Sequence, residues 1–125
     1  DSDVPQGSEE FQAFADQLIE LAPRTGASVA NELLPCAFWS APPSGDPHAV
    51  TAPGSPAVLV IGNTGDAATP YQQAVDVAAN LEDGHLLTLD ATGHVGSGRS
   101  ACVDDASTAY LIDLTLPAEG TTCEG

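Results

Sequence analysis

The sequence predicts an α/β fold with a parallel sheet, and three observations carry that prediction. Residues 57–61 form a short continuous apolar run, the pattern of a strand buried on both faces, and residues 85–90 form a second strand-like run. One amphipathic helical stretch lies between the two runs, and another follows the second. Strand, helix, strand, helix is a βαβα unit, whose strands are parallel and whose crossover is right-handed.

A helix is expected near the start of the chain. Ser8 can cap it, with Glu9 and Glu10 in the first turn, where acidic side chains favour the positive end of the helix dipole. Apolar residues then recur at helical spacing: Phe11, Phe14, Ala15, Leu18 and Ala22. Pro23 ends this helix, and residues 1–34 are assigned to a helical segment.

Residues 35–56 are rich in proline, glycine and serine and are predicted to be a connecting segment without regular structure. The prolines stand at Pro35, Pro42, Pro43, Pro47, Pro53 and Pro56. Phe38 and Trp39 are the large apolar side chains near its start, and we expect them to pack onto an apolar surface.

The elements of the βαβα unit follow from residue 57 to the end of the chain. Thr69 and Pro70 signal a helix start, with Thr69 at the N-cap and Pro70 at the first helical position. This helix has one apolar stripe: Tyr71, Ala74, Val75, Ala78 and Leu81. A third helix is expected from Ser100 to about Asp113, with three residues facing inward: Val103, Ala106 and Tyr110.

The predicted sheet is incomplete. The tail after the third helix is expected to be extended but is not assigned to the sheet, and two strands do not form a stable sheet by themselves. Either the first half of the chain supplies further strands, or the rest of the sheet belongs to another chain. We favour the second alternative.

The composition excludes several classes of partner. The 125 residues correspond to one domain or part of one, and 18 acidic residues stand against two basic ones, for a net charge of -16. Nucleic acid and anionic membrane surfaces are therefore not expected as partners. No apolar stretch approaches the roughly 18 residues that would insert across a bilayer.

Asp66 and His94 are the candidate catalytic residues. Each follows one of the two predicted strands, and the carboxyl ends of parallel strands share one edge of a sheet. There a carboxylate can orient an imidazole for general-base catalysis. The alternatives are that Asp66 only caps its loop and that His94 is an ordinary exposed histidine. His48 and His85 have no comparable setting, and we assign them structural roles.

Other site motifs are missing from the sequence. The glycine-containing loop at 62–65 lacks the further glycine of a dinucleotide site and the lysine of a P-loop. The histidines and cysteines lack zinc-ligand spacing, so neither a cofactor nor a metal ion is predicted. A Gly-x-Ser-x-Gly nucleophile motif is also absent.

Several motifs together resemble the C-terminal TAP-like region of secreted bacterial tripeptidyl aminopeptidases, which are serine peptidases of the α/β-hydrolase fold. They are the Pro-to-Tyr run at 56–71 with its Asp-x-x-Thr-Pro, Gly-His at 93–94, Cys-x-x-Trp at 36–39 and the cysteines at 102 and 123. The resemblance covers roughly residues 33–123. It implies that residues 57–125 are the C-terminal βαβα unit of such a fold and that 1–34 end a lid or cap region.

The resemblance also implies roles for individual residues. Asp66 would be the acid of a Ser-His-Asp triad and His94 its general base, while the serine would come from an upstream part of the hydrolase. Cys102 and Cys123 would form a disulfide, leaving Cys36 to pair outside this chain, and the location would be extracellular or in the cell envelope. The cysteine count alone would favour three reduced, buried thiols in a cytosolic protein.

Two functions are therefore carried forward. In the first, the chain belongs to a secreted serine hydrolase that releases short peptides from N-termini, and by itself it lacks a nucleophile. Phe38 and Trp39 are then candidates to line the substrate cleft, with core packing of at least one of them as the alternative. In the second, the chain is a non-catalytic secreted module stapled by its disulfide, or an inactive truncated relative.

Overall fold

The computed structural model describes residues 4–42, 45 and 48–125 and divides the chain into two compact units, Asp1–His48 and Ala49–Gly125. Positions 1–3, 43, 44, 46 and 47 of the expected helical and proline-rich segments lie outside the described residues. Within the described part, no helix has the length and apolar character needed to cross a membrane.

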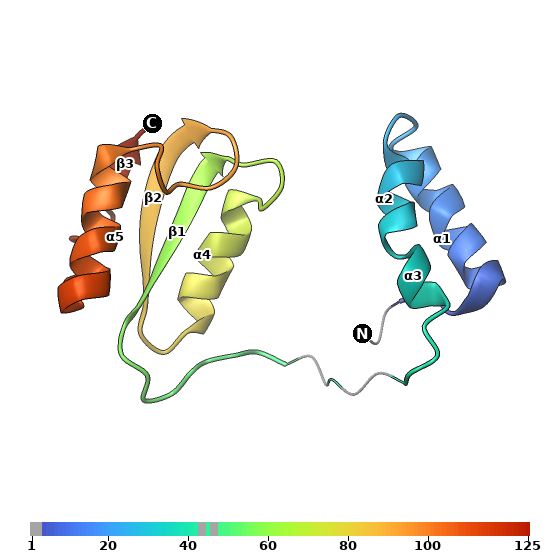
Figure 1. The fold of residues 1–125 in the computed structure, drawn as a ribbon, viewed down its shortest axis with the longest axis horizontal. Coiled ribbons are helices and arrows are strands. Elements are labelled where there is room, and N and C mark those ends of the chain that lie inside the picture. Colours follow the sequence, from blue (N-terminus) through green and yellow to red (C-terminus); the bar gives the residue numbers. More distant parts are fainter. Residues whose placement is uncertain (1–3, 43–44, 46–47) are drawn as a thin grey trace. The chain divides into compact units, whose positions relative to one another are not determined.

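The N-terminal unit consists of three helices: α1 (Gly7–Leu21), α2 (Gly26–Glu32) and α3 (Leu34–Ala37) (Figure 1). Its buried side chains are small, namely those of Ala15, Ala30 and Ala37. Gly26 lies so close to α1 that a Cβ placed there would be 2.1 Å from the carbonyl oxygen of Leu18. Small residues thus allow the helices to pack backbone against backbone, with the predicted face of α1 turned inward.

Two expectations for this region are wrong in detail. The α1 helix begins at Gly7, so Ser8 is already inside it, and the carboxylate of Glu10 accepts the N–H of the N-cap residue Gln6 instead. The one-turn helix α3 lies partly within residues 35–56, where no regular structure was expected. Pro35 is compatible with it because a proline in the first turn lacks only an N–H that has no intrahelical partner.

The C-terminal unit contains the predicted βαβα order followed by a further strand. Its elements are β1 (Val58–Gly65), α4 (Tyr71–Asn80), β2 (Gly84–Thr92), α5 (Ala101–Asp113) and β3 (Thr122–Glu124). All strand pairs are parallel, and the order across the sheet is β1-β2-β3 (Figure 1). The α/β class with a small parallel sheet is therefore confirmed.

The third strand comes from the tail of this chain, which the sequence analysis left outside the sheet. In β3, Cys123 pairs with Leu89 of β2, and Thr122 and Glu124 pair with the residues on either side. Three residues carry too little pattern to distinguish a strand from extended coil. The register with β2 decides it, and neither the first half of the chain nor a second chain supplies this strand.

The two long helices of the C-terminal unit cover opposite faces of the sheet (Figure 1). On the α5 face, the buried side chains of Leu87, Leu89, Val103 and Cys123 form the core. On the α4 face, the Tyr71 hydroxyl lies 2.7 Å from that of Thr88. Side chains alternate between the two faces along a strand, so Leu87 points toward α5 and Thr88 points toward α4. These contacts fix how each helix is placed along β2.

The β1 strand is less buried than its sequence predicted. Val58, Leu59, Val60 and Ile61 are only half-buried, although their continuous apolar run indicated burial on both faces. Within the described residues, β1 is one of the two edge strands and pairs only with β2. Its other edge therefore presents unpaired backbone groups beside apolar side chains.

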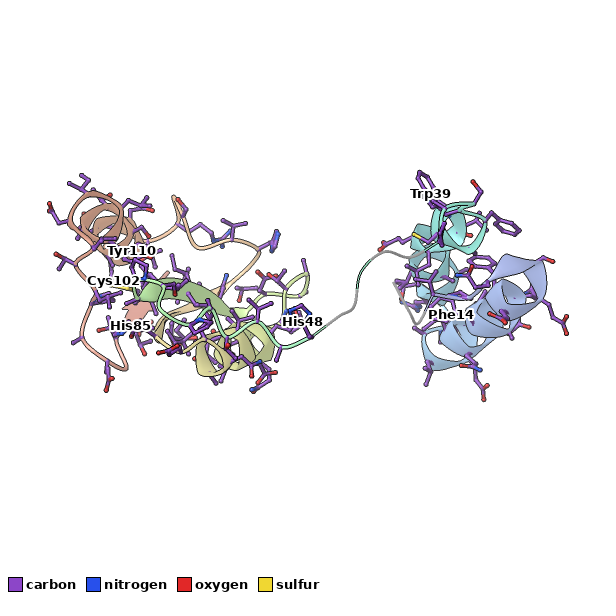
Figure 2. All side chains as sticks on the ribbon, turned by 90° about the horizontal axis from the view of Figure 1, so that it is seen from below. Phe14, Trp39, His48, His85, Cys102 and Tyr110 are labelled. Atoms are coloured by element: carbon purple, nitrogen blue, oxygen red, sulfur yellow. A yellow bond between two sulfur atoms is a disulfide. The ribbon has the colours of Figure 1, made fainter. Side chains whose placement is uncertain are left out.

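A disulfide between Cys102 and Cys123 joins α5 to β3, with the two Cα atoms 5.7 Å apart. Cys102 lies on the side of α5 that faces the sheet (Figure 2). Cys123 is buried in the core, whereas Cys36 is exposed and its thiol is free. The cross-link holds the short β3 strand on the sheet, which three backbone pairs alone would hold weakly.

We expect reduction of this disulfide to lower the free energy of unfolding by about 3 kcal/mol, because it opens a loop of roughly 20 residues in the unfolded chain. The measurement is urea unfolding of Cys36→Ala protein with and without a thiol reductant. Cys36→Ala itself is the control and leaves the oxidised midpoint unchanged. Equal midpoints for the oxidised and reduced protein would contradict the stabilising role.

Candidate active site

The structure brings Asp66 and His94 together at the carboxyl end of the sheet. Asp66 follows β1 directly, and His94 follows β2 after one intervening residue, Gly93. The His94 Nδ1 atom lies 2.8 Å from Oδ2 of Asp66 and 3.1 Å from Oδ1. The Asp66 side chain is 4% exposed and that of His94 is 55% exposed. A buried acid thus holds an imidazole that remains open to solvent.

Backbone and side-chain donors surround the Asp66 carboxylate. The N–H groups of Ala68 and Thr69 donate to Oδ1 at 2.9 and 3.0 Å, and the Thr69 hydroxyl donates to Oδ2 at 2.9 Å. The Thr69 N–H, followed by His94 and the Ala68 N–H, holds the pKa of Asp66 well below its usual range, against the opposing effect of burial. The carboxylate is therefore ionised at neutral pH.

Asp66 does both things that the sequence left as alternatives. It caps its own loop through the N–H groups two and three residues later, as aspartate commonly does in turns. It also binds the imidazole of His94. Each oxygen of the carboxylate has more than one acceptor site, so the two interactions do not compete.

The ionised carboxylate decides the tautomer of His94. A carboxylate only accepts hydrogen bonds, so the Nδ1 atom that contacts Asp66 carries a proton. In the neutral ring, Nε2 is then the unprotonated nitrogen and can accept a proton from a hydroxyl. In the part of the chain that the structure describes, Nδ1 is the only ring nitrogen of His94 with a hydrogen-bond partner.

The loop that carries His94 has an unusual backbone. Gly93 has φ 124° and Val95 has φ 69°, so His94 lies between two residues in the left-handed half of conformational space. For the β-branched Val95 this is strained, and such strain persists only where surrounding contacts impose it. The loop is therefore held in a shape that its own sequence does not favour.

A groove of about 410 Å³ adjoins the Asp66–His94 pair. Its walls are the edge of β1, one side of α4 and the loop after His94, and its lining is largely apolar: Val60, Ile61, Pro70, Ala74, Val77 and Val95. Gly96 brings the loop close to β1, since a Cβ there would be 3.1 Å from Ile61. The pair thus stands at one end of an apolar groove along the open strand edge.

The remaining sequence candidates lie elsewhere. Phe38 and Trp39 belong to the N-terminal unit and are 59% and 70% exposed, with Trp39 projecting from that unit (Figure 2). Their role in a substrate cleft stays a prediction. His85 lies at the start of β2, in line with the buried Leu87. Among the described residues, no cluster of histidine, cysteine or acidic side chains is arranged to hold a metal ion.

Sequence reasoning missed three residues around the pair. Thr69 was assigned as a helix N-cap, but α4 begins at Tyr71 with Pro70 at its N-cap, and the Thr69 hydroxyl binds Asp66 instead. The Asp-x-x-Thr-Pro spacing could have indicated this contact. Asn63 and Arg99 contact the backbone ahead of His94, and no local pattern signals either contact.

Comparison with known proteins agrees with this geometry. Residues 22–123 match the family model described as TAP-like protein. The chain belongs to the TAP-like protein family. The resemblance seen in the sequence is thereby confirmed, and the three-stranded sheet is part of an α/β-hydrolase fold.

Curated relatives of this TAP-like chain carry the names of hydrolases. It is 50% identical to serine protease Hip1 of Mycobacterium tuberculosis over 90 residues, which are 70% of this chain. It is 39% identical over 89 residues to carboxylesterase B of the same species and 34% identical over 92 residues to tripeptidyl aminopeptidase of Streptomyces lividans. The aligned residues span 17% of the length of each relative.

The depressed pKa of Asp66 predicts a pH dependence of stability. A folded-state pKa below the unfolded value of about 3.9 gives stability that is fully present above that value and is lost progressively as pH falls from there through the lower folded-state pKa. We expect wild type to exceed Asp66→Asn in stability at pH 7 and the difference to shrink below about pH 4.

The measurement is the urea midpoint of both proteins from neutral to acid pH. Asp76→Asn, which alters an exposed acid on α4, is the control for removing one surface charge. A difference between wild type and Asp66→Asn that stays constant down to the acid limit would contradict the electrostatic role of the shell around Asp66.

Proposed function

We propose that this chain supplies the acid and the general base of a Ser-His-Asp triad to a serine hydrolase, most specifically an aminopeptidase that releases short peptides from N-termini. The observation that carries the proposal is the 2.8 Å contact between the buried Asp66 carboxylate and Nδ1 of the exposed His94 ring. This contact orients the ring and leaves Nε2 for a serine hydroxyl.

In the proposed mechanism, His94 transfers a proton in each half of the reaction, formation of the acyl-enzyme and its hydrolysis. Nε2 takes the proton from the serine as its Oγ attacks the substrate carbonyl, and the resulting imidazolium gives it to the leaving amine. Nε2 then takes a proton from the water that attacks the acyl carbonyl and passes it to the serine Oγ as the acyl–Oγ bond breaks, which releases the acid product and restores the serine hydroxyl. Asp66 stays ionised throughout and stabilises the imidazolium, a role that suits a carboxylate with a strongly depressed pKa.

The nucleophile and the oxyanion hole belong to the proposed partner, the upstream part of the same hydrolase. The 125 residues contain no Gly-x-Ser-x-Gly motif, and the aligned residues cover 17% of the relatives. The half-buried β1 edge and the apolar groove beside it fit a further strand of that part. Such a strand would cover the exposed apolar side chains and place residues next to His94.

A peptide substrate is supported by two relatives named as a serine protease and a tripeptidyl aminopeptidase. The relative named carboxylesterase B makes esters the other class to test. The disulfide supports a location in the cell envelope or outside the cell, because disulfides persist in oxidising compartments.

The test is covalent labelling of the assembled enzyme, this chain together with its serine-bearing part, by a fluorophosphonate. We expect His94→Ala to slow labelling and peptide turnover by on the order of 10⁶-fold and Asp66→Asn by on the order of 10⁴-fold. His85→Gln, which alters a histidine at the other end of β2, is the matched control and retains full rate.

Labelling at the wild-type rate in His94→Ala would exclude the triad role. Wild-type assembly that is never labelled and turns over neither peptides nor esters would instead favour the non-catalytic module. Comparing peptide and ester turnover in the active enzyme separates the two substrate classes.

A further inference from the structure

Asn63 contacts the chain at both members of the Asp66–His94 pair. It lies in β1 and is 5% exposed. Its side-chain Nδ2 donates to the carbonyl oxygen of Gly93, the residue before His94, at 2.5 Å. Its main-chain oxygen accepts the N–H of Asp66 at 3.3 Å. One buried residue therefore links the backbone at the acid to the backbone at the base.

A polar side chain at this place in β1 is itself informative. The preceding part of the strand, 58–61, is wholly apolar, and burying an amide is unfavourable unless its polar atoms are hydrogen-bonded. In Asn63 both polar atoms are used, since Oδ1 also accepts the Gly65 N–H at 3.4 Å. The amide thus spans the ends of β1 and β2, where Gly93 N–H also donates to the Gly65 oxygen.

Arg99 holds the adjacent carbonyl. Its guanidinium donates to the Thr92 oxygen at 2.6 Å and lies over Gly93, where a Cβ would be 2.8 Å from it. The chain has 18 acidic residues and two basic ones. Yet among the described residues the only ion pair joins His94 to Asp66, so Arg99 binds a backbone carbonyl in place of a carboxylate.

We infer that Asn63 and Arg99 are positioning residues for His94: by binding the successive carbonyls of Gly93 and Thr92, they hold Nδ1 of His94 within hydrogen-bond distance of Asp66. This inference rests on the proposed triad role of the pair. Glycine has the widest backbone freedom of any residue, so the φ of 124° at Gly93 depends on surrounding contacts, and these two bonds are among them.

The expected consequence is kinetic. A displacement of about 1 Å at a catalytic group lowers the rate by up to about 100-fold without removing any reacting atom. A positioning defect lowers kcat because the misplaced imidazole takes the serine proton less often, and it leaves KM nearly unchanged because substrate contacts are intact.

The experiment compares two isosteric substitutions on neighbouring positions of β1 in the assembled enzyme. Asn63→Leu removes the bond to Gly93. It also removes the weaker bond from the Gly65 N–H to Oδ1. Thr64→Val removes a side-chain bond on the same strand that does not reach the His94 loop, the exposed bond from the Thr64 hydroxyl to Asp90 at 2.7 Å. We expect Asn63→Leu to lower kcat by about 10- to 100-fold with KM within about threefold, and Thr64→Val to change neither by more than about twofold.

Arg99→Met provides a second test on an exposed side chain whose loss leaves the core intact. We expect the same kcat-specific fall, smaller at about 3- to 10-fold because this bond is exposed to water. It decides the question if Asn63→Leu fails to fold.

A spectroscopic readout separates positioning from general destabilisation. In ¹⁵N-histidine-labelled enzyme, the Nδ1 proton of His94 in its carboxylate hydrogen bond gives a low-field resonance, assigned by its absence in His94→Ala. We expect Thr64→Val to retain this resonance and Asn63→Leu to lose or broaden it. Unchanged resonance and kcat in both Asn63→Leu and Arg99→Met would overturn the inference, while His94→Ala would still decide the triad separately.

Discussion

The hydrogen bond between the Asp66 carboxylate and Nδ1 of His94 is the interaction on which the functional interpretation depends. The two residues are 28 positions apart in the chain, yet Nδ1 of His94 lies 2.8 Å from Oδ2 of Asp66. They come together because β1 and β2 are parallel neighbours whose carboxyl ends lie side by side. The helix α4 between them brings the chain back to the end of the sheet where β1 began, so β2 runs in the same direction as β1. The pair is therefore a product of topology.

The groups around Asp66 keep its buried carboxylate ionised. Asp66 is nearly inaccessible to water, which alone would raise its pKa, and the N–H groups of Thr69 and Ala68 more than reverse that effect. The backbone donors cost no side-chain entropy and cannot lose their protons. In a chain with 18 acidic and two basic residues, fixed backbone dipoles supply what lysine or arginine side chains supply elsewhere. Arg99, one of the two basic residues, also pairs with the backbone, because its guanidinium donates to the Thr92 carbonyl oxygen.

The sheet of this chain is asymmetric. At one edge the short strand β3 is held to α5 by a disulfide, and at the other edge β1 lies beside an apolar groove. The candidate active site lies at the β1 side. The proposed upstream part of the hydrolase would pair at this edge, beside the acid and the base. The family match, the groove and the exposed imidazole therefore agree with one another.

The sequence by itself determined the βαβα order, the inward faces of α1 and α4, and the meeting of Asp66 with His94, because these follow from short-range periodicity and from the direction of parallel strands. Only the tertiary structure decided that the tail pairs as β3, that the Thr69 hydroxyl turns to Asp66 instead of capping α4, and that Asn63 reaches Gly93. The Thr69 contact is local, and the Asp-x-x-Thr-Pro spacing carries its signal. The β3 pairing and the Asn63 bond depend instead on which atoms of a distant segment lie within hydrogen-bond range. That distance is set by the packed register of the sheet and leaves no trace in the local pattern of residues.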